Sequence, residues 1–156
     1  MISYRQLLDL SLVLLTPLIA VIATYIAWQQ WKTNQLKVKL DRYDRRLKVY
    51  EEVQSILRII LRDANASYDD LLRFRISVAE ADFLFGAEIT EFIEEIYQRG
   101  LKLTWWTKQY RDYTQQEPPG YDHQKVVDGM HSELTWITSQ FDPARLKFKR
   151  YLDISG

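Results

Sequence analysis

An apolar run near the N-terminus constrains this chain more than any other feature. Residues 10–27 (LSLVLLTPLIAVIATYIA) carry no formal charge. A helix of about 20 apolar residues crosses the hydrocarbon core of a bilayer, and residues 7–27, with only Asp9 intruding, reach that length. The sequence therefore predicts one transmembrane helix within residues 1–31, preceded by a short outer tail.

The residues that flank this run fit a membrane–water interface, where aromatic rings and basic groups are favoured. The predicted interface residues are Tyr4, Tyr25, Trp28, Trp31 and Lys32. A cleaved signal peptide and a buried core helix are the alternatives. The signal peptide is disfavoured because only Arg5 precedes the run and no good cleavage site follows it. Pro17 is tolerated in a membrane helix and should bend it.

The charges balance overall but are unevenly distributed. Lys+Arg and Asp+Glu number 21 each, which gives no reason to expect a nucleic-acid partner. Residues 32–48 nevertheless hold seven bases and only two acids. By the positive-inside rule, this block places the C-terminal side in the cytoplasm and the N-terminus outside. Whether the block also binds anionic lipid or only sets the topology stays open.

Residues 32–156 are expected to form an all-α domain, an antiparallel bundle of about four helices. No glycine or proline occurs between residues 28 and 62, so the first helix should be continuous with the transmembrane helix. The helices are predicted at about residues 32–62, 68–82, 87–113, 122–140 and 143–152.

Local signals place several of the predicted helix ends. Ser67 and Asp70 have the spacing of a capping box. Asp142 precedes a proline, which predicts an N-cap followed by proline at the first helical position. The apolar residues 83–85 ahead of Gly86 are expected to plug the end of a helix, with the glycine allowing the turn.

The first helix carries a regular apolar seam. Its members recur at alternating spacings of four and three residues, as in a coiled coil: Leu36, Leu40, Tyr43, Leu47, Tyr50, Gln54, Leu57 and Leu61. Residues 50–61 are expected to dock on the chain's own helices. For residues 36–47, docking and a homo-oligomeric coiled coil both remain open.

The sequence offers no arrangement typical of catalysis. It has no cysteine, and its histidines, His123 and His131, lie too far apart on one helix to share a metal. The acidic pair of Glu91 and Glu95 is explained by the dipole at a helix start. No Gly-rich phosphate loop or nucleophile elbow is present. The chain is therefore predicted to use no cofactor or metal and not to be an enzyme.

Partner contacts are predicted at two places. Adjacent residues on a helix point about 100° apart, so Trp105 and Trp106 cannot both face the core and one of them can cover a partner. The other place is the seam with its neighbouring arginines. The full set of candidate contacts is Leu36, Leu40, Tyr43, Leu47, Arg45, Arg46, Trp105 and Trp106.

Two stretches resemble a known group of proteins. Residues 34–50 (NQLKVKLDRYDRRLKVY) and 83–89 (FLFGAEI) are similar to the patterns N-K-L-K-L-x-L-F-D-[KR]-R-x-x-V-Y and F-L-F-G-x-E-I of small bacterial membrane-anchored helical proteins. The chain departs from the pattern at Tyr43, where phenylalanine is expected. The resemblance implies the architecture and a bacterial inner-membrane location, and it supplies no catalytic residues.

The function expected from the sequence is that of a membrane-anchored helical interaction or scaffold module. It would associate with copies of itself or bind a protein partner at the cytoplasmic membrane face, with the lipid bilayer as a further partner. The alternative is a membrane-active effector of a phage lysis or antiphage system, which the short outer tail and the span with its central proline permit.

Overall fold

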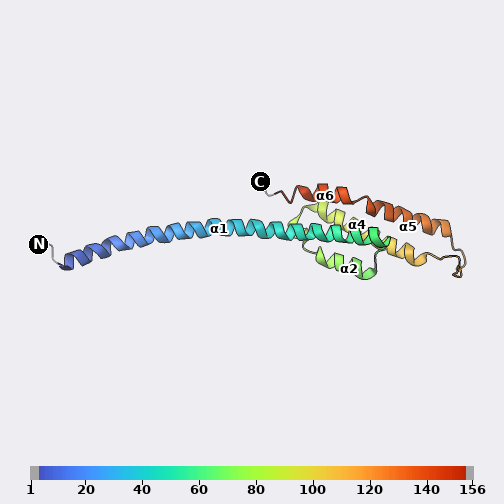
Figure 1. The fold of residues 1–156 in the computed structure, drawn as a ribbon, viewed down its shortest axis with the longest axis horizontal. Coiled ribbons are helices and arrows are strands. Elements are labelled where there is room, and N and C mark those ends of the chain that lie inside the picture. The colour runs from blue at the N-terminus through green and yellow to red at the C-terminus, as the bar shows by residue number, and fades with distance from the viewer. Residues whose placement is uncertain (1–3, 154–156) are drawn as a thin grey trace. The chain divides into compact units, whose positions relative to one another are not determined.

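The computed structural model describes the backbone of residues 4–153 and the side chains of residue 15 and residues 17–153. In that part of the chain all regular structure is helical and no β-strand occurs, which confirms the predicted all-α class. The helices are α1 (Tyr4–Asp63), α2 (Tyr68–Ser77), α3 (Ala81–Leu84), α4 (Ala87–Gln109), α5 (His123–Thr138) and α6 (Phe141–Lys149) (Figure 1). The chain divides into two compact units between Asp41 and Arg42.

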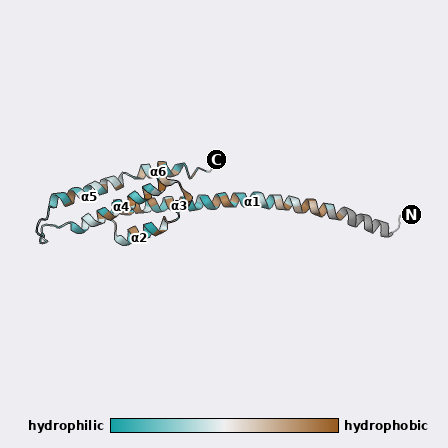
Figure 2. Cartoon of the chain, turned by 180° about the vertical axis from the view of Figure 1, so that it is seen from behind, coloured by the Kyte–Doolittle hydropathy of each residue, from teal (hydrophilic) through white to brown (hydrophobic). Residues whose placement is uncertain are grey.

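The described residues of the first unit belong to the N-terminal part of α1, and the rest of this helix lies in the second unit. This helix continues without a break through residues 28–40, which confirms the predicted continuity. Pro17 is its only proline, and the residues that follow, up to Asp63, include neither proline nor glycine to interrupt the hydrogen-bond ladder. Figure 2 shows that hydrophobic residues recur along the N-terminal described part of α1.

The predicted transmembrane helix is not found. Within the part of the chain whose side chains are described, no helix has a stretch long and apolar enough to cross a bilayer. The uncharged stretch there ends at Trp31 and includes Thr24, Gln29 and Gln30, whereas a crossing takes about 20 predominantly apolar residues. This contradicts the predicted single-pass inner-membrane location with its N-terminus outside. The first residues of the predicted run, up to residue 14, lie outside the described side chains.

The second unit is a helical bundle with one hydrophobic core. The C-terminal part of α1 and the helices α2, α4, α5 and α6 lie side by side in both views (Figures 1 and 2). Each helix contributes buried apolar side chains, among them Ile60 from α1, Leu71 from α2, Ile96 from α4, Ile137 from α5 and Phe148 from α6. No buried side-chain nitrogen or oxygen in the described region lacks a hydrogen-bond partner.

The buried face of α1 differs slightly from the predicted seam. Its buried residues are Val49, Val53, Ile56, Leu57 and Ile60. Docking of the helix on its own bundle is therefore confirmed, but Leu61 is 57% exposed and does not belong to the docked face. The reason is geometric: the bundle covers a stripe centred on Val53, Ile56 and Ile60, and Leu61 lies at its edge.

The start of α2 is as predicted and its end is not. Ser67 accepts a hydrogen bond from the Asp70 amide (3.1 Å), and the Asp70 carboxylate accepts one from the Ser67 amide (3.2 Å), which confirms the capping box. The helix was expected to reach Asp82 but ends at Ser77. The chain then turns, with Val78 and Ala81 both buried, and forms the short helix α3.

The predicted apolar plug at residues 83–85 is only partly correct. Phe85 is buried, whereas Phe83 is 90% exposed. Gly86 is the N-cap of α4 and has a negative φ, so glycine is not required there for the turn. Glycine leaves room there for a close approach, because a Cβ atom on residue 86 would lie only 3.0 Å from the hydroxyl oxygen of Tyr151.

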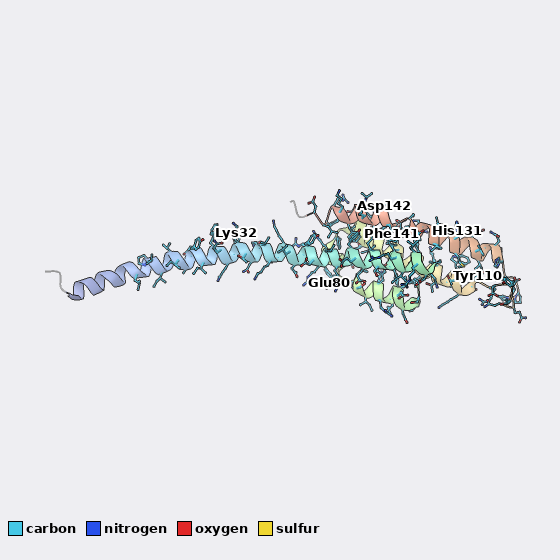
Figure 3. The ribbon with its side chains drawn as sticks, in the orientation of Figure 1. Lys32, Glu80, Tyr110, His131, Phe141 and Asp142 are labelled. Atoms are coloured by element: carbon cyan, nitrogen blue, oxygen red, sulfur yellow. The ribbon has the colours of Figure 1, made fainter. Side chains whose placement is uncertain are left out.

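Two further helix ends differ from the prediction. The predicted end of α4 was residue 113, but the helix ends at Gln109, because the Arg111 amide donates to the hydroxyl of Tyr121 (3.0 Å) instead of to a helical carbonyl. Asp142 is not an N-cap. The helix α6 begins at Phe141, so Asp142 and Pro143 lie in its first turn, where the amide that proline lacks needs no helical partner (Figure 3).

Candidate interaction surface

The predicted seam on α1 is exposed at its first two residues. Leu36 is 58% exposed and Leu40 is 44% exposed, whereas Tyr43 and Leu47 are half-buried. Leu36 and Leu40 belong to the first unit, which contains no other helix. In the described part of the chain these two leucines therefore form an apolar face on a helix without a covering neighbour. Covering such a face with a partner is favourable in proportion to the apolar area removed from water.

The helix around this face is supported by contacts between successive turns. The Thr33 hydroxyl donates to the carbonyl of Gln29 (2.9 Å), and the Gln29 amide donates to the hydroxyl of Tyr25 (2.9 Å). These contacts use the side chains of the helix itself, so they hold its conformation without covering Leu36 or Leu40.

The predicted interface residues lie on the same unit. Tyr25, Trp28 and Trp31 are exposed, and the rings of Tyr25 and Trp28 lie 6.3 Å apart. The ammonium group of Lys32, which Figure 3 labels on α1, is 5.8 Å from the centroid of the Trp28 ring, a cation–π contact. The side chain of Tyr4 lies outside the described residues.

The two arginines of the candidate set have different surroundings. The Arg46 guanidinium donates to the carbonyls of Leu84 (3.0 Å) and Tyr151 (3.2 Å) and lies 5.5 Å from the Tyr151 ring. It therefore ties α1 to the turn before α4 and to the C-terminal segment. Arg45 is exposed and forms an ion pair with Glu80 (3.4 Å), which Figure 3 labels beside α1. Arg46 thus serves the bundle's own packing.

Glu88 completes the contacts of the C-terminal segment. Its carboxylate accepts a hydrogen bond from the Tyr151 hydroxyl (3.1 Å) and pairs with Arg150. The hydrogen bond from Tyr151, together with the Arg150 pair, lowers the pKa of the Glu88 carboxyl below its ordinary value. The Tyr151 ring also packs edge-on against Phe85, with 5.2 Å between the centroids. Sequence reasoning missed this cluster because its members are distant in the chain.

The tryptophan pair divides between the bundle and its surface. Trp106 packs against Gly129 of α5 so closely that a Cβ atom on residue 129 would lie 2.4 Å from the indole. Trp105 is 53% exposed, and its ring meets that of Trp106 edge-on at 4.5 Å. The two indoles do not both face the core, as the sequence predicts, and Trp105 is the one available to a partner.

Two exposed groups of large side chains were missed by sequence reasoning. The first is a stripe on the outer face of α2, formed by Tyr68, Leu72 and Ile76. Their spacing of four residues is a signal that could have identified it. The second lies around the loop after α4 and consists of exposed Tyr110 and Tyr113 (Tyr110 is labelled in Figure 3). The two tyrosines in a polar loop are the sequence signal that could have predicted this exposed group.

The bundle also has a groove of about 760 Å³ between α2, α3 and the first half of α4. Several of its lining side chains are acidic, and one of them, Glu94, is paired with Arg75. Glu95, which also lines the groove, pairs with Arg99 (3.2 Å). These pairings place the carboxylates of Glu94 and Glu95 in ion pairs at the surface of α4.

No group of three metal-ligating side chains is present among the described residues. His123 lies beside the rings of Tyr110 and Tyr121, with centroids 5.6 Å and 6.0 Å away. His131 is exposed on α5 (Figure 3). The histidines therefore belong to separate surroundings, and the most distinctive surface of the molecule is the exposed face of α1.

Comparison with known proteins adds no relative. No protein-family model, no curated protein and no solved structure matches the chain.

Proposed function

We propose that this protein is a helical interaction module that holds copies of itself or a protein partner together through the exposed face of α1. The observation that carries the proposal is the exposure of Leu36 and Leu40 on a helix whose later turns are buried in the bundle. Two leucines one helical turn apart form a continuous apolar strip, and covering such a strip is favourable in proportion to the area removed from water.

The bundle supports this function by holding the end of the helix. Five side chains between Val49 and Ile60 are buried, and Arg46 adds hydrogen bonds to two carbonyls of the bundle. A folded body is thus attached to a helix that presents an apolar face. A folded body with an exposed apolar helix can hold a partner in place, and binding of this kind requires no catalytic side chain.

The test is the mass of the full-length chain in solution, measured by sedimentation equilibrium in a mild non-ionic detergent over a range of protein concentrations. The expected result is an assembly larger than the 18.7 kDa monomer. The double substitution Leu36→Asp with Leu40→Asp should reduce it to the monomer, since it places charges on the apolar strip.

A matched control is available on the opposite side of the same helix. Asn34→Asp with Val38→Asp adds the same charge at the same spacing, and both positions are exposed. Each lies about 200° around the helix from its counterpart on the seam. This variant should keep the native mass. A native chain that is monomeric at every concentration and captures no partner from cells would contradict the proposed function.

A further inference from the structure

The face of Leu36 and Leu40 extends towards the N-terminus with the same spacing. Steps of four and three residues back along α1 lead through Thr33, Gln29, Ile26, Ile22, Ile19 and Leu15. The six leucines and isoleucines of this series, Leu15, Ile19, Ile22, Ile26, Leu36 and Leu40, are each between 44% and 58% exposed. The seam therefore covers nearly four heptads between residues 15 and 40.

We infer that this face binds a second copy of the same chain, in parallel and in register, along residues 15–40 of α1. The inference rests on the proposed function, of which it names the partner and the geometry. In the paired state each seam residue of one helix faces the same residue of the other, as in a two-stranded parallel coiled coil.

The area available is sufficient for a specific interface. With about half of each side chain exposed, a leucine or isoleucine of the seam offers on the order of 90 Å². Six such residues from each of two copies therefore supply about 1,000 Å², before the flanking residues are counted. Leu18 and Tyr25 flank the seam, are also exposed, and would widen the contact.

The isoleucines and the single amide fit a parallel pair. Ile19 and Ile26 occupy two a positions of the heptad, and Leu15 and Leu36 occupy two d positions, a combination that favours two parallel strands; Ile22 at a d position departs from it. Gln29 occupies a d position, and its side-chain NH₂ group already donates to Tyr25. In register, two Gln29 side chains face each other, so the remaining amide hydrogens and oxygens can form hydrogen bonds between the copies. A shifted register would place each amide against an isoleucine or a leucine.

The charges distinguish the parallel arrangement from the antiparallel one that would also match the seam. In the parallel pair, Lys39 lies beside Asp44 of the second copy, five residues further along the chain. The same parallel pair also brings Lys32 beside Lys37 of the second copy, so each attractive contact of Lys39 with Asp44 is accompanied by one repulsive contact. In the antiparallel pair that brings Gln29 opposite Thr33, g residues face g residues, so Lys39 instead lies beside Tyr25 and Lys32 beside Lys32 of the second copy, and neither lysine has an acidic partner.

The pairing should end near Leu40. Beyond it Tyr43 and Leu47 are already half-buried, and Tyr50 packs against Phe148 of α6 with 5.4 Å between the ring centroids. The later part of the seam is thus covered by the chain's own bundle, and the second copy takes the earlier part.

The absence of cysteine from the chain allows a direct test by disulfide trapping. Single substitutions Ile26→Cys, Leu36→Cys and Leu40→Cys are made in the full-length protein, and the purified variants are oxidised mildly. Each should form a disulfide-linked dimer, since a parallel pair brings identical seam residues within about 6 Å between Cα atoms. Val38→Cys, which is equally exposed but off the seam, should cross-link several-fold more slowly. Concentrated guanidinium chloride should remove the difference.

Three outcomes would overturn the inference, and they separate it from the proposed function. Preferential cross-linking between Ile26→Cys and Leu36→Cys in a mixture would show an antiparallel pair and leave self-association intact. Equal rates at positions 36, 38 and 40 would show no specific second copy. A monomeric chain that binds phosphatidylcholine vesicles and forms no disulfide at any position would identify lipid as the covering partner, and would contradict self-association as well.

Discussion

The single helix α1 presents the same apolar periodicity in two regions that have opposite surroundings. Leu57 and Ile60 are completely buried in the bundle, whereas Leu36 and Leu40, several turns earlier, are about half exposed. The spacing of the apolar residues is similar in both regions, and both regions belong to one continuous helix. The periodicity therefore identifies the apolar face of the helix. The chain's own helices cover that face around Leu57 and Ile60, and we assign the face around Leu36 and Leu40 to a second copy.

The two regions also differ in where their side-chain hydrogen bonds lead. In the bundle, the buried hydroxyl of Thr104 donates to the carbonyl of Ala66 (2.7 Å), which joins α4 to the turn before α2. Around Leu36 and Leu40, side-chain hydrogen bonds such as that of Thr33 stay within α1. The hydrogen bonds of the bundle thus join different elements of the chain, whereas those around Leu36 and Leu40 join successive turns of one helix.

The largest expected effect comes from removing a side chain in the buried region. Leu57→Ala should lower the free energy of unfolding by about 3 kcal/mol, because a fully buried leucine loses its contacts and leaves a cavity. Leu61→Ala, four residues later on the same helix, should change it by less than about 0.5 kcal/mol, since Leu61 is mostly exposed. Urea unfolding followed by circular dichroism measures both. Equal effects would contradict the assignment of the buried face.

A smaller effect is expected from the two adjacent arginines. Arg46→Met should destabilise the bundle by about 1–2 kcal/mol, because two carbonyls at its surface lose a charged donor. Arg45→Met removes an exposed ion pair and should cost less than about 1 kcal/mol. The same unfolding measurement compares them. The comparison would fail if Arg45 proved to be the more important residue for stability.

The smallest effect is a pH dependence at Glu88. Its pKa is lower in the folded chain than its ordinary value of 4.5, chiefly because Tyr151 donates a hydrogen bond to the carboxylate. A carboxyl group with a lowered pKa stabilises the fold above its unfolded pKa, and that contribution is lost as the pH falls through the folded pKa. The native chain should therefore lose stability relative to Glu88→Gln below about pH 4.5.

The measurement for Glu88 is the urea midpoint of the native chain and of Glu88→Gln between about pH 6 and pH 3. Tyr151→Phe should behave like Glu88→Gln, because it removes the main cause of the lowered pKa. A difference between native chain and variant that stays constant with pH would show that the Tyr151 contact does not act on the ionised carboxylate.

Features set by a few adjacent residues were the ones that could be predicted from the sequence. The capping box depends only on the identity of Ser67 and of Asp70, three residues later. The continuity of α1 beyond Pro17 depends on the absence of proline and glycine from that stretch. Helix geometry predicts that only one of Trp105 and Trp106 can face the core. Which of the two does so depends on Gly129 of α5, against which Trp106 packs.

Features set by distant residues could not be predicted. The end of α4 depends on a hydrogen bond from Arg111 to Tyr121, ten residues later. The role of Arg46 depends on Leu84 and Tyr151, which its local sequence does not indicate. The predicted membrane span was wrong for a local reason: it was inferred from the apolar run and its aromatic and basic flanks, and the described part of α1 mixes that run with polar residues from Thr24 to Gln30.

Hydrogen exchange of the full-length chain, with and without Leu36→Asp and Leu40→Asp, tests most directly whether the two regions of α1 are covered by different molecules. Amides that open only with loss of tertiary support exchange slowly, and those of an uncovered helix exchange quickly. The native assembly should protect amides 26–40, the variant should lose that protection, and amides 49–60 should remain protected in both. Loss of protection in both regions together, or in neither, would contradict this account.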